Sequence, residues 1–402
     1  MIKVVKRALI VFRNVITLRR LRKFIYAYIK KIKYRKIAQQ IELSFSKPAV
    51  FIFQHQFFDC SAKHCFNGGA ERYVCDLADI LTDMGYIPCL IQMGNKKGHF
   101  WQKNVDNLEI IGISVKNIED YTAFLQGFRR YEFVIYSGYT DWGTKIHPNI
   151  LISHGVTWDT QDKDVHSQRI LKVIQDVDNF VSVDVNTISW LRTTFSKTLS
   201  KKRMNYIPNY VDTKKYVPLK RKNDGKIHLL FPRRASAERG YWLVSTALPY
   251  ILKKYQNIVF DFVGFAHTDA IRRDIKKLSG QFLGRVNHYV VKPNEMIGIY
   301  QKTDIAIIPT LYSEGTSLSC LEAQACGNIV ISTNIGGLAN LILDGYNGFL
   351  INPDIYDLTD ALDRALSNPL LCEKISLNAI EVAKAFDKTI WISKWESIIK
   401  SI

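Results

Sequence analysis

Two glutamates with a fixed spacing are the residues most able to do chemistry in this chain. They lie in TLYSEGTSLSCLEAQACG, residues 310–327, where Glu314 precedes an expected helix and Glu322 follows eight residues later. A single acid here, such as Glu322, also fits an ordinary helix surface. The two acids together, around a capped glycine turn, are harder to explain as surface residues and indicate a functional site.

The start of that helix supplies the phosphate-binding part of the motif. Thr316 or Ser317 is placed to cap the helix by accepting a hydrogen bond from a free backbone N–H. Gly315 lets the backbone approach a ligand closely. The unpaired N–H groups and the positive end of the helix dipole favour an anion. The segment therefore predicts a phosphate site at a strand-to-helix junction.

A second junction, FPRRASAERG at residues 231–240, carries two arginines five positions apart, Arg234 and Arg239. Gly240 opens the following helix. Guanidinium groups bind phosphate oxygens in a bidentate manner, so this pair suits a diphosphate. Two solvated loop charges are the alternative interpretation.

These junctions belong to two series of short apolar runs that alternate with helical periodicity. Such alternation is typical of parallel strands in doubly wound sheets. The expected strands are 50–54, 87–92, 109–113, 132–136, 150–155 and 180–184, then 227–232, 258–264, 304–309, 328–332 and 348–351. Ligands of such sheets bind at the carboxyl ends of the strands, so the cleft between two such domains is the expected site.

The sequence predicts an α/β protein with two facing Rossmann-like domains after a basic helical arm. The arm covers residues 1–48, the first Rossmann-like domain covers 49–219 and the second covers 220–385. Residues 386–402 are expected to form a helix that packs back on the N-terminal domain.

From about residue 50 to its end, the chain resembles glycosyltransferase family 4, whose members are retaining enzymes of the GT-B fold. The most specific part of the resemblance is Glu314-Gly315 to Glu322-Ala323, which looks like the E-x7-E element of the family. In the second half of the chain, GGLANLILDGYNGFLINPDI (336–355) resembles the segment after that element, and IPNYVDTKKYVP (207–218) resembles the segment before the second domain. In the first half, Gly68-Gly69-Ala70-Glu71-Arg72 resembles the glycine loop of the family and His154-Gly155 resembles its acceptor-side histidine. The resemblance implies transfer of a hexose from a nucleotide-diphosphate sugar to a hydroxyl acceptor.

The resemblance also implies roles for the charged residues. Glu314 would hold hydroxyls of the donor sugar, and Glu322 would hold the ribose of the nucleotide. Arg234 and Arg239 would neutralise the diphosphate leaving group. The family usually has Lys at the position of Arg239, so this residue keeps the charge and changes the geometry.

Two further residues follow from the resemblance on the acceptor side. The backbone of Gly69 would approach the phosphates or the acceptor, and His154 would line the reaction centre. A histidine satisfied at a strand end is the alternative for His154. Donor departure would then need no metal, because arginines and helix N–H groups stabilise the developing charge, and the acceptor would attack the face that the leaving group vacates.

Other chemistries fit the residues less well. The D-x-D pairs Asp162/Asp164 and Asp176/Asp178 lie in or beside expected helices rather than at a strand end, which disfavours a metal-dependent transferase. The loop after the first strand could be taken for a metal site, but the spacing of its candidate ligands matches no structural zinc pattern: His55, Asp59, Cys60, His64 and Cys65. No cofactor is expected besides the donor substrate. A nucleotide-sugar epimerase of related fold and a non-catalytic membrane-bound partner remain as alternatives.

The net charge of +18 is concentrated in the arm. Residues 1–48 hold 14 Lys and Arg and one acid, Glu42, so they carry +13 and the rest of the chain carries +5. No apolar run there reaches the roughly 20 residues of a membrane span. A stripe at helical spacing runs among the basic residues: Val5, Leu9, Phe12, Ile16, Leu21, Ile25, Tyr28 and Ile32.

A basic helix with an apolar stripe is typical of a membrane interface. Residues 1–36 are therefore expected to bind an anionic membrane surface, at about 1 kcal/mol for each basic side chain that reaches it. Packing on the body or a partner, a nucleic-acid arm and a mitochondrial presequence are the alternatives, and nucleic acid would leave the stripe unexplained. Seven cysteines in apolar runs or loops fit a reducing compartment. The sequence thus favours a cytoplasmic enzyme, peripheral on the cytoplasmic face, that acts on a lipid-linked or surface-polysaccharide glycan.

Overall fold

The computed structural model describes residues 25–26, 28–59, 62–65, 68–92, 101–105, 108–115, 118–139, 146–155, 163–220, 224–312 and 314–402. The N-terminal stripe as far as Leu21, and also Cys60 and Asp162, lie outside these residues. The chain divides into two compact units: residues 1–66, 81–150 and 176–178 form the first, and residues 67–80, 151–175 and 179–402 form the second. Residues 67–80 and 151–175 are thus grouped with the second unit, and the expected domain boundary near residue 220 stays a prediction.

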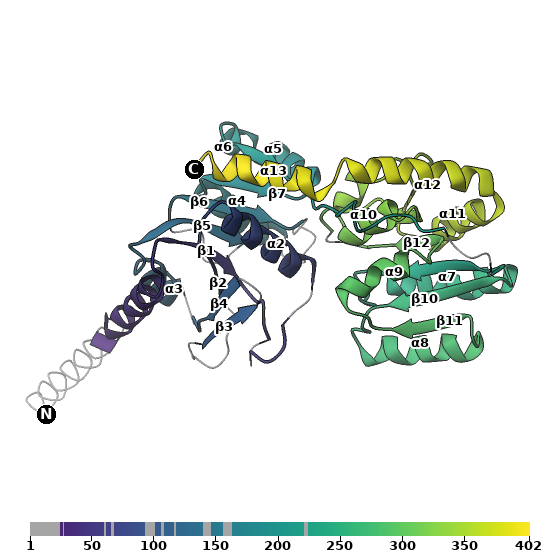
Figure 1. Ribbon diagram of the computed structural model, residues 1–402, viewed down its shortest axis with the longest axis horizontal. Coiled ribbons are helices and arrows are strands. Elements are labelled where there is room, and N and C mark those ends of the chain that lie inside the picture. Colours follow the sequence, from purple (N-terminus) through teal and green to yellow (C-terminus); the bar gives the residue numbers. More distant parts are fainter. Residues whose placement is uncertain are drawn as a thin grey trace, which may run out of the picture. The chain divides into compact units, whose positions relative to one another are not determined.

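The first sheet has eight strands in the order β3-β4-β2-β1-β5-β6-β7-β8 (Figure 1). Its strands are β1 (Ala49–Gln54), β2 (Pro88–Gln92), β3 (Trp101–Val105), β4 (Leu108–Gly112), β5 (Tyr131–Ser137), β6 (Asn149–Ser153), β7 (Asn179–Ser182) and β8 (Met204–Tyr206). The helices among them are α2 (Gly69–Asp83), α3 (Ile118–Leu125), α4 (Lys163–Gln175), α5 (Val185–Thr194) and α6 (Ser196–Leu199). Strand β1 pairs in parallel with β2 and β5, whereas β3 pairs antiparallel with β4.

The second sheet has six strands in the order β11-β10-β9-β12-β13-β14. Its strands are β9 (Ile227–Phe231), β10 (Ile258–Val263), β11 (Val286–Tyr289), β12 (Ile305–Ile308), β13 (Ile329–Thr333) and β14 (Phe349–Ile351). The helices are α7 (Tyr241–Lys254), α8 (Asp269–Gln281), α9 (Met296–Tyr300), α10 (Leu318–Ala325), α11 (Ile355–Ser367), α12 (Pro369–Lys384) and α13 (Lys388–Ile399), with 3₁₀ turns at Pro293–Glu295 and Gly336–Asn340. All its pairings are parallel.

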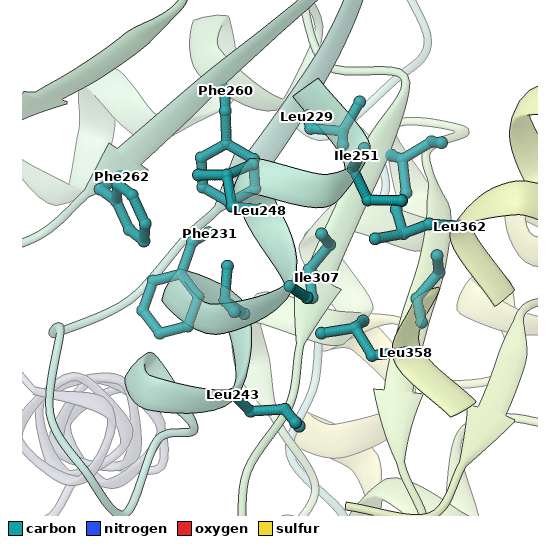
Figure 2. Packing of buried hydrophobic residues seen from close by; sticks show 14 of the residues in the cluster. Leu229, Phe231, Leu243, Leu248, Ile251, Phe260, Phe262, Ile307, Leu358 and Leu362 are labelled. Carbon is teal, nitrogen blue, oxygen red and sulfur yellow. The ribbon is translucent and has the colours of Figure 1, made fainter. Parts of the chain in front are cut away.

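Alternate residues of this sheet enter two separate cores. One core packs α7, α8 and α11 on Phe231, Phe260 and Ile307 (Figure 2). The other packs α10 and α12 on the opposite face, where Leu230 and Ile308 lie. Burial on both faces explains why these strands are continuous apolar runs. It also fixes the carboxyl ends of β9 and β12, from which the two predicted junctions start.

The expected strands are present in both sheets, and three observed strands were not expected. Strand β3 lies at a sheet edge and its side chains are only partly buried, so its sequence WQKNV lacks a strong apolar pattern. Strands β8 and β11 also lie at sheet edges and are only partly buried, so they too lack a continuous apolar run. The alternation therefore predicts the central strands and one edge strand, β14, and misses the other three edge strands.

The N-terminal helix, described for residues 28–43, packs on the first unit over its later turns. The Tyr34 hydroxyl donates to the Ser114 carbonyl at 3.0 Å, and Glu42 Oε2 accepts from the backbone N–H groups of Arg129 and Arg130 at 2.5 and 2.8 Å. A Cβ at Gly127 would lie 2.7 Å from the Ala38 Cβ, so glycine permits this close packing. The later part of the expected arm is thus part of the globular unit.

The C-terminal helix α13 packs on α2 within the second unit. Trp395 Nε1 donates to the Tyr73 hydroxyl at 2.8 Å, and Lys388 Nζ lies 2.7 Å from Asp76 Oδ1. Trp395 is fully buried. Aromatic packing and one ion pair therefore hold the end of the chain.

Candidate functional site

The loop between β9 and α7 places arginines beside the end of β12. Gly240 precedes α7 with φ +77°, and a Cβ there would lie 1.8 Å from the Pro309 carbonyl oxygen. Only glycine allows the two backbones to meet this closely. The contact brings Arg239, the neighbouring residue, to the segment that carries Glu314.

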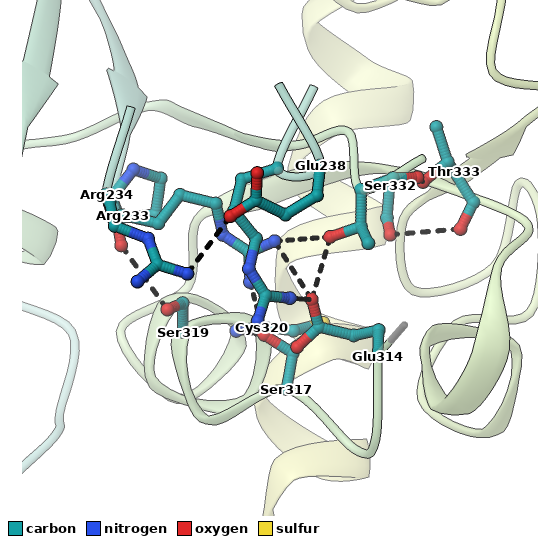
Figure 3. Close-up of polar contacts among 12 residues, drawn as sticks. Arg233, Arg234, Glu238, Glu314, Ser317, Ser319, Cys320, Ser332 and Thr333 are labelled. Carbon is teal, nitrogen blue, oxygen red and sulfur yellow. Dashed lines mark hydrogen bonds and ion pairs between the residues drawn. The ribbon is translucent and has the colours of Figure 1, made fainter. Parts of the chain in front are cut away.

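The Glu314 carboxylate is the centre of this site (Figure 3). Its Oε2 accepts hydrogen bonds from Arg233 Nη1 at 3.1 Å, from Thr310 Oγ1 at 2.7 Å and from Arg239 Nη1. The Glu314 side chain is 10% exposed. Burial by itself would raise the pKa of this carboxyl, but Arg233 and Arg239 outweigh it and hold the pKa below its usual value. Glu314 is therefore ionised at neutral pH.

Arg233 is a site residue that the sequence analysis missed. Its guanidinium also donates to Thr310 Oγ1 and, at 3.0 Å, to Ser317 Oγ, and its side chain is only 9% exposed. It therefore links the ends of β9 and β12 to the start of α10. The sequence alone does not show which arginine of the Arg233-Arg234 doublet points into the site.

Arg234, the arginine that the sequence analysis selected, makes different contacts. Its Nη2 lies 3.0 Å from Glu238 Oε1, and its guanidinium lies 5.8 Å from the centre of the Phe265 ring. Figure 3 shows this side chain paired with Glu238, apart from Glu314. Its predicted role toward a diphosphate stays a prediction. Arg239 does contact Glu314, as described above.

The start of α10 has the cap that the sequence predicts. Ser317 is the N-cap residue, and its hydroxyl accepts from the Cys320 N–H at 3.4 Å. The Thr316 hydroxyl is occupied by the protein: it donates to the Val183 carbonyl at 2.7 Å and accepts from the Asn209 N–H at 2.8 Å. Of the two hydroxyls, that of Ser317 thus lies with the arginines.

Four glycines pack the backbone around Glu314. A Cβ at Gly315 would lie 2.7 Å from the His154 carbonyl oxygen, and one at Gly155 would lie 2.6 Å from the Gly315 nitrogen. Gly336 and Gly337 would meet the backbone of residues 314–316 at 2.2 and 2.3 Å. The loop that carries Glu314 is therefore fixed by backbone contacts on both sides, which helps to preorganise the carboxylate.

His154 follows β6 and lies next to this loop through its backbone. Its ring meets the Tyr73 ring edge-on, with centroids 5.2 Å apart. Burial lowers the pKa of His154 to about 4. The imidazole is therefore neutral at physiological pH and suits hydrogen bonding with a hydroxyl group rather than charge pairing.

Glu322, the second predicted acid, contacts Arg72 in the first turn of α2. Arg72 Nη1 lies 2.7 Å from Glu322 Oε1, and the Glu322 side chain is 6% exposed. A Cβ at Gly69 would lie 3.2 Å from Leu318 Cδ1, so the first turn of α2 faces the first turn of α10. The structure brings these two predicted elements together within the second unit.

Comparison with known proteins agrees with this architecture. Residues 212–382 match the family described as glycosyl transferases group 1. A D-inositol 3-phosphate glycosyltransferase of Arthrobacter sp. is 31% identical over 150 residues, which is 36% of this chain and 35% of that protein. A glycogen synthase of Mycobacterium tuberculosis is 22% identical over half of this chain and 49% of its own length. The chain thus spans between about a third and a half of these relatives.

Solved structures cover far more of the chain. Sucrose-phosphate synthase from Thermosynechococcus elongatus aligns with a TM-score of 0.71 at 17% identity, over 88% of this chain and 99% of that one. Anabaena HepE in complex with UDP-glucose aligns with a TM-score of 0.67 at 13% identity, over 88% and 100%. The predicted GT-B fold and the predicted resemblance to a glycosyltransferase family are confirmed. The assignment to family 4 stays a prediction.

Proposed function

We propose that this chain, whose residues 212–382 match the glycosyl transferases of group 1, transfers a sugar from a nucleotide-diphosphate sugar to a hydroxyl acceptor with retention. One observation carries the proposal: Glu314 is buried, ionised and oriented by Arg233 and Arg239 at the capped start of α10. A carboxylate suits sugar hydroxyls, while the guanidiniums and the helix N–H groups suit a diphosphate.

The donor would use both parts of this arrangement. Glu314 accepts hydrogen bonds from the hydroxyls of the transferred sugar, and Glu322 accepts those of the ribose. Arg239, with Arg234, Gly315 and Ser317, faces the diphosphate. Because HepE is solved with UDP-glucose, this nucleotide sugar is the first donor to test.

Charge separation is the step that the site would accelerate. Departure of the nucleoside diphosphate leaves negative charge on its phosphates and positive charge on the sugar ring. Preorganised donors that meet such charge contribute about 3–4 kcal/mol each to transition-state stabilisation. The acceptor hydroxyl attacks the face that the leaving group vacates and passes its proton to the departing phosphate oxygen. Neutral His154 orients the sugar or the acceptor by hydrogen bonding.

Transfer is tested with a panel of UDP, GDP, ADP and dTDP sugars, in which release of nucleoside diphosphate and formation of product are measured. We expect Glu314→Gln to lower turnover at least a hundredfold, because a neutral amide cannot match the ion pairs. Glu396→Gln, at an exposed ion pair with Lys400, is the matched control and should keep wild-type turnover. Conversion of the donor alone to an epimer, or binding without turnover, would replace the proposal with an epimerase or a non-catalytic partner.

The acceptor is proposed to be a lipid-linked or surface-polysaccharide glycan, because the N-terminal helix has a surface suited to an anionic membrane. Apolar side chains at helical spacing are exposed on it: Ile25, Tyr28, Ile29 and Ile32. Residues 1–48 also carry +13. In the part of the chain that the structure describes, no helix is long and apolar enough to cross a membrane. These features together support a helix that lies in the membrane interface and holds the chain at the cytoplasmic face of the membrane.

Membrane binding is tested by flotation with phosphatidylglycerol and phosphatidylcholine vesicles. The double change Ile29→Ser and Ile32→Ser should lower partitioning to the anionic vesicles about tenfold, because each isoleucine loses part of its burial energy in the interface. The matched control changes Leu370 and Leu377, which are more exposed than these isoleucines and lie on α12, to Ser and should float as wild type. Equal flotation of all three proteins would refute the membrane surface.

A further inference from the structure

Arg72 is a charged residue of the glycine loop for which the proposed reaction has no role. Its guanidinium lies 2.7 Å from Glu322 Oε1, with side-chain exposures of 33% for Arg72 and 6% for Glu322. Burial by itself would lower the pKa of Arg72, but the Glu322 carboxylate outweighs it and raises this pKa. The Arg72 guanidinium is therefore charged.

The pair leaves the Glu322 carboxylate able to bind something else. Glu322 Oε1 is buried, and none of its contacts within the described residues meets strict hydrogen-bond geometry, although Arg72 Nη1 lies 2.7 Å away. Burial and the nearby Glu322 carboxylate raise the pKa of Tyr216 and of Tyr300. A buried acceptor atom without an aligned donor is costly, and a ligand hydroxyl with better geometry would satisfy it.

The surroundings of Arg72 favour an anion. Gly69 and Leu318 bring the first turns of α2 and α10 into contact, so two helix starts with free N–H groups lie near one another. Glu314 is already paired with two arginines, Arg233 and Arg239. With Arg72 the cluster has three guanidiniums and two carboxylates, which leaves one positive charge for an incoming anion.

We propose that Arg72 is a diphosphate ligand of the donor site: it holds Glu322 in the unliganded chain and moves to the diphosphate when the ribose takes that carboxylate. The exchange is favourable in charge, because a neutral diol replaces the guanidinium at Glu322 while the guanidinium gains two phosphate groups. This inference rests on the proposed function, since it assumes that Glu322 holds a ribose.

The test compares ligands with and without the diphosphate on the same protein. Dissociation constants of inorganic pyrophosphate, of the panel nucleoside diphosphate that binds best and of its nucleoside are measured for wild type, Arg72→Ala and Arg72→Lys. Loss of a charge-assisted contact weakens binding by about tenfold to a hundredfold. We expect Arg72→Ala to weaken pyrophosphate and the nucleoside diphosphate by that factor, with the nucleoside bound as well as before or more tightly. The matched control is Arg272→Ala, from an exposed ion pair with Asp269, and it should change none of the three constants.

A purely structural role of Arg72 gives a different result. The nucleoside and the nucleoside diphosphate would then weaken by the same factor, and that outcome overturns the inference. The ratio of the two constants does not depend on the folded fraction, so a less stable variant still gives an answer. Should Arg72→Ala fail to fold, Arg72→Lys decides: a smaller preference for the diphosphate supports the inference, and an unchanged preference overturns it. A wild type that binds no nucleotide of the panel would instead refute the proposed function.

Discussion

Replacement of Arg233 by Met should destabilise the chain far more than the same change at its neighbour Arg234. Arg233 is buried, and its guanidinium donates to Glu314, Thr310 and Ser317. Methionine keeps an unbranched chain like the aliphatic stem of arginine, but it has none of these hydrogen-bond donors. Glu314 would retain only Arg239 and Thr310, inside a site where its side chain is 10% exposed.

The structure sets the expected magnitudes. Breaking a buried ion pair by removing one partner costs about 3–5 kcal/mol. Because Arg239 still pairs with Glu314, we expect the lower end, about 3 kcal/mol, for Arg233→Met. The Arg234–Glu238 pair is 39% and 27% exposed, and such surface pairs contribute about 0–1 kcal/mol. Urea unfolding followed by circular dichroism measures both variants against wild type.

The cost of Arg233→Met should also depend on pH. The pKa of Glu314 in the folded chain lies below its ordinary value, so its ion pairs stabilise the fold above the unfolded pKa, and this contribution is lost as pH falls through the folded pKa. The difference between wild type and Arg233→Met should therefore shrink in acid. A cost for Arg234→Met equal to or larger than that for Arg233→Met at neutral pH would refute the assignment of Arg233 to the site.

Three further predictions concern the same region. Burial lowers the pKa of His154 from 6.5 to about 4, so between these pH values the histidine is protonated in the unfolded chain and neutral in the folded chain. Wild type should therefore lose up to about 3 kcal/mol of stability as pH falls from 6.5 to 4. If the stability of His154→Gln, measured by unfolding, falls with pH as steeply as that of wild type, this prediction is wrong. Gly240→Ala should cost at least about 2 kcal/mol, since its φ is +77° and a Cβ would overlap the Pro309 carbonyl; wild-type stability in denaturant titrations would show that the loop relaxes freely. Thr316→Val should cost about 1–3 kcal/mol, because it removes the buried hydrogen bond to Val183 and a partly buried one from Asn209, and nucleotide affinity should stay unchanged. Weaker nucleotide binding in calorimetry would show that this hydroxyl is a ligand instead.

The sequence predicts the central strands because their burial on both faces requires continuous apolar runs. The same argument places Glu314 and Arg239 at carboxyl ends of neighbouring strands, β12 and β9, and the structure brings them into contact. A helix cap at Thr316 or Ser317 follows from local chemistry alone, and the structure places it at Ser317. Features that depend on a local sequence pattern can thus be predicted from the sequence alone.

Features that depend on contacts between distant segments cannot be predicted in this way. The choice between Arg233 and Arg234 is made by Thr310 and Ser317, which lie about 80 positions away. Residues 34–45 of the expected arm pack on the first unit because Ser114 and Gly127 accommodate them, which the stripe of the arm does not reveal. The ion pair between Arg72 and Glu322 likewise joins two helices, α2 and α10, that only the fold brings together.

A crystal structure of the chain with an intact nucleotide sugar tests the central claim most directly. We expect the two phosphates beside the first turn of α10 within hydrogen-bonding distance of Arg239, with hydroxyls of the transferred sugar on Glu314. Phosphates bound away from the carboxyl ends of β9 and β12, with the Glu314 ion pairs unchanged and no sugar hydroxyl on that carboxylate, would contradict the account.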